Sequence, residues 1–327
     1  MEENNAPGAE PARLEYLQER IELLKKQIAS VIVGQRQTVD LVLTAILADG
    51  HVLLEGVPGV AKTLLAKLTA RLIDADFSRI QFTPDLMPSD VLGTTVFNMQ
   101  RGDFEFHRGP VFANIVLVDE INRAPAKTQS ALFEVMEERQ ATVDGNTYPM
   151  SSPYIVLATQ NPVEQEGTYP LPEAQLDRFL MKITIGYPSA EEELEILTRH
   201  QQRRDFLKLD ALGPVLTSAE MEELRACAAG VYVEASLLRY IVQIVQQTRQ
   251  SKTVFLGASP RATVGLLHAA KAYALLQGRD FVTPEDVKFV APYVLQHRVI
   301  LTAEAEMEGW SVLKVIRRLI EKVEVPQ

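Results

Sequence analysis

The sequence predicts an α/β fold, with a five-stranded parallel sheet flanked by helices and followed by a helical region. Apolar runs typical of strands buried on both faces alternate with segments whose apolar residues recur at helical spacing. A glycine-containing loop joins the first of these strands to a helix. After Tyr187 and Pro188 no strong strand signal remains, while helix starts become frequent. These observations favour two domains in the 327 residues.

The amino-terminal part supplies the predicted sheet. Residues 1–12 are acidic and proline-containing, so we expect them to be disordered, and residues 13–187 form the expected αβα domain. Helical spacing of apolar residues predicts helices over about 13–29, 36–49, 64–72 and 126–139. Strands are predicted over 51–55, 79–82, 114–120, 154–159 and 179–184.

Two hairpins are predicted between these elements. One joins strands at 94–98 and 104–107, and the other joins strands at 141–143 and 147–148 through Asp144-Gly145-Asn146. Their tips are either solvated turns or loops presented to another molecule.

Residues 188–327 are predicted to form a helical second domain. Ser189 with Glu192, and Thr217 with Glu220, have the spacing of capping boxes, which mark helix starts. Two further starts, at Ser259-Pro260 and Thr283-Pro284, pair a capping residue with a first-turn proline.

Composition narrows the functional class. The net charge of −10, from 33 basic and 43 acidic residues, argues against a nucleic-acid binder, and no apolar run is long enough to cross a bilayer. Cys227 is the only cysteine and residues 1–10 lack a secretion signal, so we expect a cytoplasmic protein. No metal-ligand spacing links the five histidines.

The glycine-containing loop is typical of a phosphate-binding loop. Its glycines let several backbone N–H groups point at one anion, and the helix that follows adds the positive end of its dipole. Lys62 supplies a charge for the terminal phosphates, and the Thr63 hydroxyl can hold Mg²⁺. The alternative is a chance glycine turn. The predicted phosphate-binding residues are Gly56, Val57, Pro58, Gly59, Val60, Ala61, Lys62, Thr63 and Leu64.

One position of the loop departs from the general pattern. Ala61 stands where the pattern has glycine. Alanine is tolerated if that residue is already helical, so we interpret the loop as a variant.

Asp119 and Glu120 end a predicted buried strand. Ligands of open α/β sheets bind at the carboxyl ends of the strands, so Asp119 can hold Mg²⁺, directly or through water, opposite Thr63. Glu120 could then orient or deprotonate a water that attacks the terminal phosphate. The alternative is a solvated acidic pair that merely ends a strand.

Three further polar residues are candidates. Asn161 ends the next strand and could hold water or phosphate, although an asparagine turn before proline is a competing interpretation. Arg178 could stabilise the charge of a transferring phosphoryl group, often from a neighbouring subunit, or form a local salt bridge. Arg261 lies in the first turn of a helix, where the dipole opposes a cation unless an anion is bound; it could instead reach solvent.

Together these residues resemble the motifs of AAA+ ATPases, and more closely those of the MoxR family. The loop from Gly56 to Thr63 is similar to that family's Walker A motif, including its alanine before the lysine. The resemblance implies a role for each of the other candidates: Asp119 on Mg²⁺, Glu120 as the catalytic glutamate, Asn161 as sensor 1, Arg178 as the arginine finger, Arg261 as sensor 2, and Gly34 with Gln35 near the adenine.

The resemblance also implies an overall function. It implies an AAA+ αβα core, an all-α lid with ATP between the two, and a ring, commonly hexameric, in which Arg178 completes the next subunit's site. MoxR proteins are viewed as chaperone-like, often acting with von Willebrand factor A domain partners in complex maturation or metal insertion. The alternatives are a metal-chelatase motor subunit, a nucleic-acid motor, for which Arg101 and Arg108 are the only hints, and a non-hydrolysing nucleotide switch.

Overall fold

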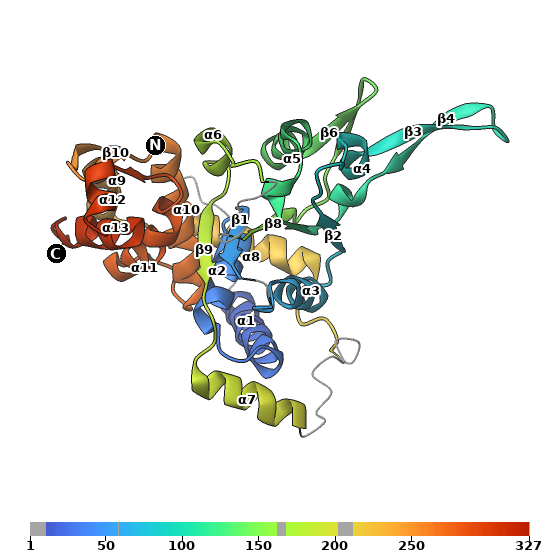
Figure 1. The fold of residues 1–327 in the computed structure, drawn as a ribbon. Helices are drawn as coiled ribbons and strands as arrows, with labels where there is room; N and C mark the ends of the chain where they lie inside the picture. Colours follow the sequence, from blue (N-terminus) through green and yellow to red (C-terminus); the bar gives the residue numbers. More distant parts are fainter. Residues whose placement is uncertain (1–10, 58, 162–167, 202–211, 327) are drawn as a thin grey trace, which may run out of the picture.

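A five-stranded parallel sheet forms the centre of the protein. The computed structural model describes residues 11–57, 59–161, 168–201 and 212–326. The strand order is β2-β5-β8-β1-β9, and every neighbouring pair is parallel, as predicted (Figure 1). The strands are β1 (Val52–Gly56), β2 (Phe77–Gln81), β5 (Ile115–Asp119), β8 (Ile155–Gln160) and β9 (Met181–Ile185).

Helices cover both faces of this sheet, because its central strands are apolar on both sides. Alternate residues of β5 pack into different hydrophobic clusters: Leu117 faces one and Val118 the other. The first cluster includes α1 (Pro11–Val31), α2 (Arg36–Leu47) and α3 (Lys62–Leu72). The second includes α5 (Ala126–Glu138) and Val91 of α4 (Pro88–Leu92). The result is the expected three-layered αβα domain.

The prediction that residues 1–12 are disordered is wrong at its last two residues. Of the segment 1–12 expected to be disordered, residues 1–10 lie outside the described residues, but Pro11 and Ala12 already belong to α1. Proline suits the first turn of a helix, where its missing N–H costs no hydrogen bond.

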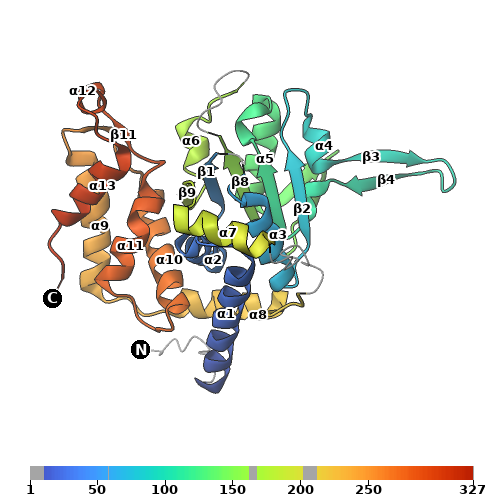
Figure 2. The same cartoon turned by 60° about the horizontal axis from the view of Figure 1, so that its bottom comes forward.

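Both predicted hairpins are present. β3 (Gly93–Asn98) pairs with β4 (Asp103–Arg108), and β6 (Gln140–Val143) pairs with β7 (Asn146–Pro149). The β3–β4 hairpin projects far from the body of the protein in both views (Figures 1 and 2). Val96, Phe97 and Phe104 of the hairpin are exposed, and Met99 at its tip is 90% exposed.

The region after β9 is mainly helical, as predicted. α9 (Ala235–Gln250), α10 (Pro260–Leu276), α11 (Pro284–Leu295), α12 (Ala303–Met307) and α13 (Val312–Glu321) gather on the side of the sheet opposite the projecting hairpin (Figures 1 and 2). This helical unit also contains a two-stranded antiparallel sheet of β10 (Val254–Leu256) and β11 (Ile300–Leu301), which are too short to give a strand signal in sequence.

Two further helices of the second region bond to the αβα domain. α7 (Ala190–Gln201) lies by α1, where Arg199 donates to the carbonyl oxygen of Ser30 at 3.1 Å. α8 (Ser218–Gly230) contacts the end of α2 through Arg225, which donates to the carbonyl oxygen of Ile46 at 2.9 Å. A boundary at residues 187 and 188 therefore stays a prediction.

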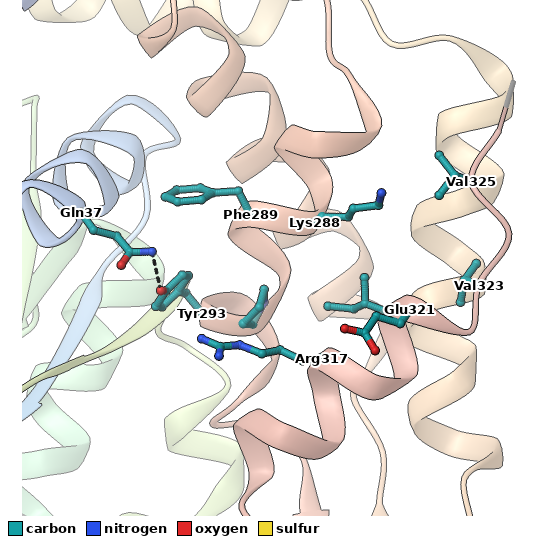
Figure 3. A pocket seen from close by; sticks show the side chains of 10 residues that line it. Gln37, Lys288, Phe289, Tyr293, Arg317, Glu321, Val323 and Val325 are labelled. Carbon is teal, nitrogen blue, oxygen red and sulfur yellow. Dashed lines mark hydrogen bonds between the residues drawn. The ribbon is translucent and has the colours of Figure 1, made fainter.

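A cavity of about 470 Å³ lies where the helical unit meets the αβα domain. Figure 3 shows the side chains of α11 and α13 around it, and the Nε2 of Gln37 donating to the Tyr293 hydroxyl at 2.8 Å. None of the predicted site residues that the structure describes lines this cavity.

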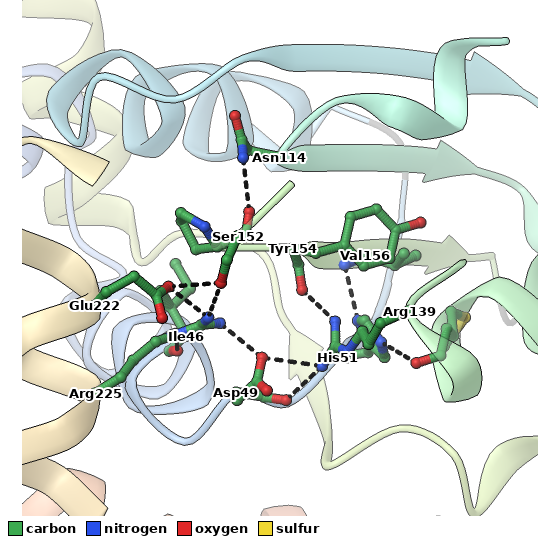
Figure 4. A network of polar contacts seen from close by, with 12 residues as sticks. Ile46, Asp49, His51, Asn114, Arg139, Ser152, Tyr154, Val156, Glu222 and Arg225 are labelled. Atoms are coloured by element: carbon green, nitrogen blue, oxygen red, sulfur yellow. Dashed lines mark hydrogen bonds and ion pairs between the residues drawn. The ribbon is translucent and has the colours of Figure 1, made fainter. Parts of the chain in front are cut away.

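A polar network fastens the amino ends of β1 and β8 to α8. The Asp49 carboxylate pairs with Arg139 at 3.0 Å and with Arg225 at 2.8 Å (Figure 4). Beside it, the buried ring of His51 accepts a bond from the Val156 N–H through Nδ1 at 2.9 Å, which leaves Nε2 to donate to the Met136 carbonyl.

No helix in the described part of the chain is long and apolar enough to span a bilayer.

His51 makes stability depend on pH. Burial lowers the pKa of His51 to about 3, so the folded protein keeps the ring neutral where the unfolded chain takes up a proton. Its contribution is complete above the unfolded pKa, near 6.5, and is lost as the pH falls towards 3. Between pH 7 and 5 the wild type should lose up to about 2 kcal/mol more unfolding free energy than His51→Gln.

Urea denaturation at the two pH values measures this difference. His107→Gln, which changes an exposed histidine of the β3–β4 hairpin, is the control and should keep the wild-type pH dependence. Equal pH slopes for the wild type and His51→Gln would contradict the assignment.

Candidate active site

The carboxyl ends of three adjacent strands meet at one cavity. β5, β8 and β1 are neighbours in the parallel sheet, so the residues that follow them share an edge. The cavity has a volume of about 380 Å³. It is lined by Gly56, Gly59, Ala61, Lys62, Thr63, Leu64, Arg79, Gln81, Asp119, Glu120, Thr159 and Asn161. The glycine loop, the acidic pair and Asn161 are therefore brought together.

The two loop glycines have different reasons to be glycine. A Cβ on Gly56 would lie 2.6 Å from the carbonyl oxygen of Ile185, because β9 passes close by. Gly59 has φ +87°, a left-handed conformation that glycine adopts without strain, and nothing lies within 4 Å of its missing Cβ. Val57 and the buried Val60 complete the described loop, while Pro58 lies outside the described residues.

The interpretation of Ala61 was wrong in one respect. Ala61 is not in the right-handed helical conformation: it has φ 58° and ψ 20°, and α3 begins only at Lys62. A left-handed alanine costs about 1–2 kcal/mol relative to a relaxed residue. The loop therefore holds a strained residue where glycine would be unstrained.

The side chain of Lys62 is bound to the backbone at the start of the loop. Its Nζ donates to the carbonyl oxygen of Gly56 at 2.6 Å. Burial lowers the pKa of Lys62, and the nearby carboxylates of Asp119 and Glu120 oppose that shift. The ammonium group thus faces the two acids across the cavity.

Asp119 is buried and bound on both oxygens. The Arg79 Nε donates to Oδ2 at 2.6 Å, and the Thr159 hydroxyl donates to Oδ1 at 3.1 Å. Charge-assisted bonds of this kind fix the orientation of the carboxylate.

Glu120 adopts an unusual backbone conformation. Its φ of 56° is left-handed, which is uncommon for a residue with a side chain. The Thr159 hydroxyl accepts a bond from the Glu120 N–H at 3.0 Å. The Gln81 Nε2 donates to the Glu120 Oε2 at 2.9 Å, and Arg123 forms an ion pair with the same oxygen at 2.9 Å. The carboxylate is therefore held at the mouth of the cavity.

Sequence reasoning assigned no chemistry to Arg79, Gln81 or Thr159. A signal was available, because Arg79 and Gln81 are two residues apart and so lie on the same side of a predicted strand. The pairing of that strand with β5, in which Gln81 lies opposite Asp119, could not be deduced from the sequence alone.

The short motif before α2 reaches the glycine loop. Gly34 and Gln35 both have left-handed backbones, with φ of 68° and 53°. The Gln35 Nε2 donates to the carbonyl oxygen of Val60 at 3.1 Å, while its buried Oε1 has no hydrogen-bond partner among the described residues. A buried acceptor without a donor is costly, so this atom is suited to a donor group of a bound molecule.

The two predicted arginines do not line this cavity. The Leu180 N–H donates to the His51 carbonyl before β1, which puts Arg178 at the amino edge of the sheet, opposite the edge where the glycine loop begins. Arg178 pairs with the Glu137 Oε2 at 3.0 Å, and Arg261 pairs with the Oε1 of the same glutamate at 2.5 Å. The resemblance implied ATP between core and lid, but here the helical unit brings Arg261 to the opposite edge.

Comparisons with known proteins show the family to which the chain belongs. Residues 51–181 match the ATPase family associated with various cellular activities (AAA), and residues 246–319 match the AAA lid domain. The chain is 47% identical to Chaperone MoxR1 of Mycobacterium tuberculosis, over 98% of this chain and 87% of that protein. The chain belongs to the MoxR family of AAA+ ATPases.

Two other similar proteins cover most of the chain as well. The uncharacterized protein YeaC of Bacillus subtilis is 50% identical over 92% of this chain and 93% of its own. A crystal structure of a protein proposed to be an ATPase, from Cytophaga hutchinsonii, superimposes with a TM-score of 0.89 at 44% identity, covering 97% of this chain and 98% of that one. The predicted fold, an AAA+ αβα core followed by a helical lid, is confirmed.

Thr159 should be necessary for this arrangement of the acids. Thr159→Val keeps the side-chain shape but removes the acceptor of the Glu120 N–H and the donor to Asp119. Leaving a buried N–H unpaired costs about 1–3 kcal/mol, and we expect ATP turnover to fall at least about tenfold as Glu120 loses its fixed position.

Phosphate release and urea denaturation measure the two effects. Thr44→Val is the matched control, because the buried Thr44 hydroxyl bonds the carbonyl of Asp40 one turn back in α2. If Thr159→Val kept wild-type turnover, the hydroxyl would not be what positions Glu120.

Proposed function

We propose that the protein is a Mg²⁺-dependent ATP hydrolase that works as a chaperone-like motor on partner proteins. The observation that carries this proposal is the single cavity shared by Lys62, Asp119, Glu120 and Asn161. A cation, two carboxylates and an amide around a glycine loop suit the binding and cleavage of a triphosphate.

The residues present fit a magnesium ion with its nucleotide. The Thr63 hydroxyl and the Asp119 carboxylate are oxygen donors of the kind that Mg²⁺ takes, with phosphate oxygens and water completing its shell. When bound, the ion neutralises charge on the phosphates. A direct bond to Asp119 Oδ2 would require Arg79 to move, whereas a contact through water would not.

Hydrolysis then depends on Glu120. Its carboxylate accepts a proton from the water whose oxygen attacks the terminal phosphorus, and the bond from that phosphorus to the bridging oxygen breaks. Lys62 and the backbone N–H groups of residues 59–63 bind the phosphate oxygens, and Asn161 orients the water or the terminal phosphate. Gln81 and Arg123 hold the Glu120 carboxylate ready.

In the proposed ring, a neighbouring subunit supplies the two arginines that do not line the cavity of their own chain. Arg178 and Arg261 lie together at the edge of the sheet opposite their own glycine loop, and this supports a contact of both with the nucleotide of a neighbouring subunit. The ring would commonly be a hexamer, acting in the cytoplasm on a protein client that could carry a von Willebrand factor A domain. The similarity to Chaperone MoxR1 supports the remodelling role.

Glu120→Gln should separate binding from hydrolysis. The amide cannot accept the proton, so we expect turnover to fall about 10²–10⁴-fold while ATP affinity changes little. Phosphate release at saturating Mg·ATP and equilibrium nucleotide binding measure the two quantities. Glu134→Gln, an exposed site on α5, is the control. Wild-type turnover in Glu120→Gln would remove Glu120 from this role.

Mixing variants tests the contact across subunits. Arg178→Ala lacks the finger and Lys62→Ala lacks the phosphate grip, so each should be inactive alone. Random mixing at equal amounts pairs an intact cavity with an intact finger at about a quarter of interfaces, and activity should return to that extent. A mixture that stays as inactive as its components would exclude a finger that acts between subunits.

A further inference from the structure

The segment that carries Arg178 is held by one buried side chain of the helical unit. Arg298 lies just after α11 and its side chain is only 4% exposed. Its Nε donates to the Asp177 Oδ1 at 2.6 Å. Its Nη2 donates to the carbonyls of Asp177 at 3.0 Å and Phe179 at 2.7 Å, and its Nη1 donates to that of Leu180 at 3.0 Å. Arg298 thus bonds residues on both sides of Arg178.

The residues before Arg298 contact the same stretch of chain. The His297 Nε2 donates to the Phe179 carbonyl at 2.9 Å, and the Gln296 Nε2 donates to the carbonyl of Lys182 in β9. Three consecutive side chains therefore fix the backbone as it enters β9.

Asp177 extends this contact to the second arginine. Its Oδ2 accepts a bond at 3.0 Å from the hydroxyl of Ser259, the residue that precedes α10. Arg261 lies two residues further on and shares Glu137 with Arg178. The Asp177 carboxylate, bound by Arg298, therefore links the segment that carries Arg178 to the residue before α10, the helix that carries Arg261.

Burying a guanidinium group to fix a loop is energetically unfavourable unless its N–H groups are all bonded. Removing its charge from water costs several kcal/mol unless every donor is satisfied, and the fork of Arg298 is satisfied almost entirely by residues 177–180. A lysine has one point charge and could not reach a carboxylate and three carbonyls at once. The geometry therefore requires an arginine, and it fixes the segment that carries the finger.

We propose that Arg298 is a positioning residue for catalysis in the neighbouring subunit: by clamping residues 177–180 it aims Arg178 at that subunit's nucleotide. The inference rests on the proposed function, in which Arg178 acts between subunits. Arg298 does not touch the nucleotide itself. It ties the helical unit of one subunit to the ATP site of the next.

Arg298→Lys in the full-length chain tests this role. The variant keeps its own cavity but aims its finger poorly, so its turnover should fall at least about tenfold with little change in the KM for ATP. Mixed with Lys62→Ala, which has an intact finger, activity should return as it does for Arg178→Ala with Lys62→Ala. Mixed with Arg178→Ala, no activity should return, because neither chain then donates a good finger.

Controls separate positioning from folding. Arg225→Lys is the matched control: its side chain is 9% exposed and bonds the αβα domain away from Arg178, so that variant should keep wild-type turnover. Asp177→Asn, which removes the charged partner of Arg298, should repeat the mixing pattern if Arg298→Lys fails to fold.

The mixtures also distinguish a failure of the Arg298 clamp from a failure of the proposed contact between subunits. If Arg178→Ala and Lys62→Ala restore activity together but neither Arg298→Lys nor Asp177→Asn is rescued by Lys62→Ala, the clamp is only structural and this inference falls. Wild-type turnover in both clamp variants would overturn it equally. If Arg178→Ala and Lys62→Ala fail to restore activity, the proposed contact between subunits falls, and the inference falls with it.

Discussion

The parallel pairing of β5, β8 and β1 is the constraint on which the rest of the site depends. Because the three strands run in one direction and lie side by side, the glycine loop, the acidic pair and Asn161 all emerge at one edge. Thr159, inside β8, then bonds both Asp119 and the backbone of Glu120 and so ties the central strand to the acids. A shift in the register of β8 would separate these groups.

The opposite edge of the sheet carries a second set of charges with a different role. Glu137 at the end of α5 holds Arg178 and Arg261 together, and Arg298 fixes the backbone on either side of Arg178. One chain therefore has the glycine loop at one edge of the sheet and a pair of cations at the other. Such a head-to-tail arrangement suits a ring built from identical subunits.

Much of the fold and of the candidate site could be predicted from local sequence. The features that could not be predicted depend on contacts between residues far apart in the chain. Apolar runs predicted the strands, and the residue types of the Gly56 to Thr63 loop indicated phosphate binding, since both signals are local. The left-handed Ala61 was mispredicted because its backbone is decided by how the loop closes onto α3. Arg79 and Gln81 had no assigned role because only strand order puts them beside Asp119, and the contact of Arg261 with Glu137 spans 124 residues.

The projecting β3–β4 hairpin has the shape of a lever arm. Its six residue pairs extend about 20 Å at roughly 3.4 Å per residue. At its root, a Cβ on Gly93 would lie 2.2 Å from the carbonyl oxygen of His107, and one on Gly109 would lie 2.3 Å from that of Val91, so backbone packs directly on backbone. An arm with so stiff a root turns with the body that holds it. A tilt of about 10° at the sheet would sweep the exposed Met99 through some 3 Å, by the same strand length.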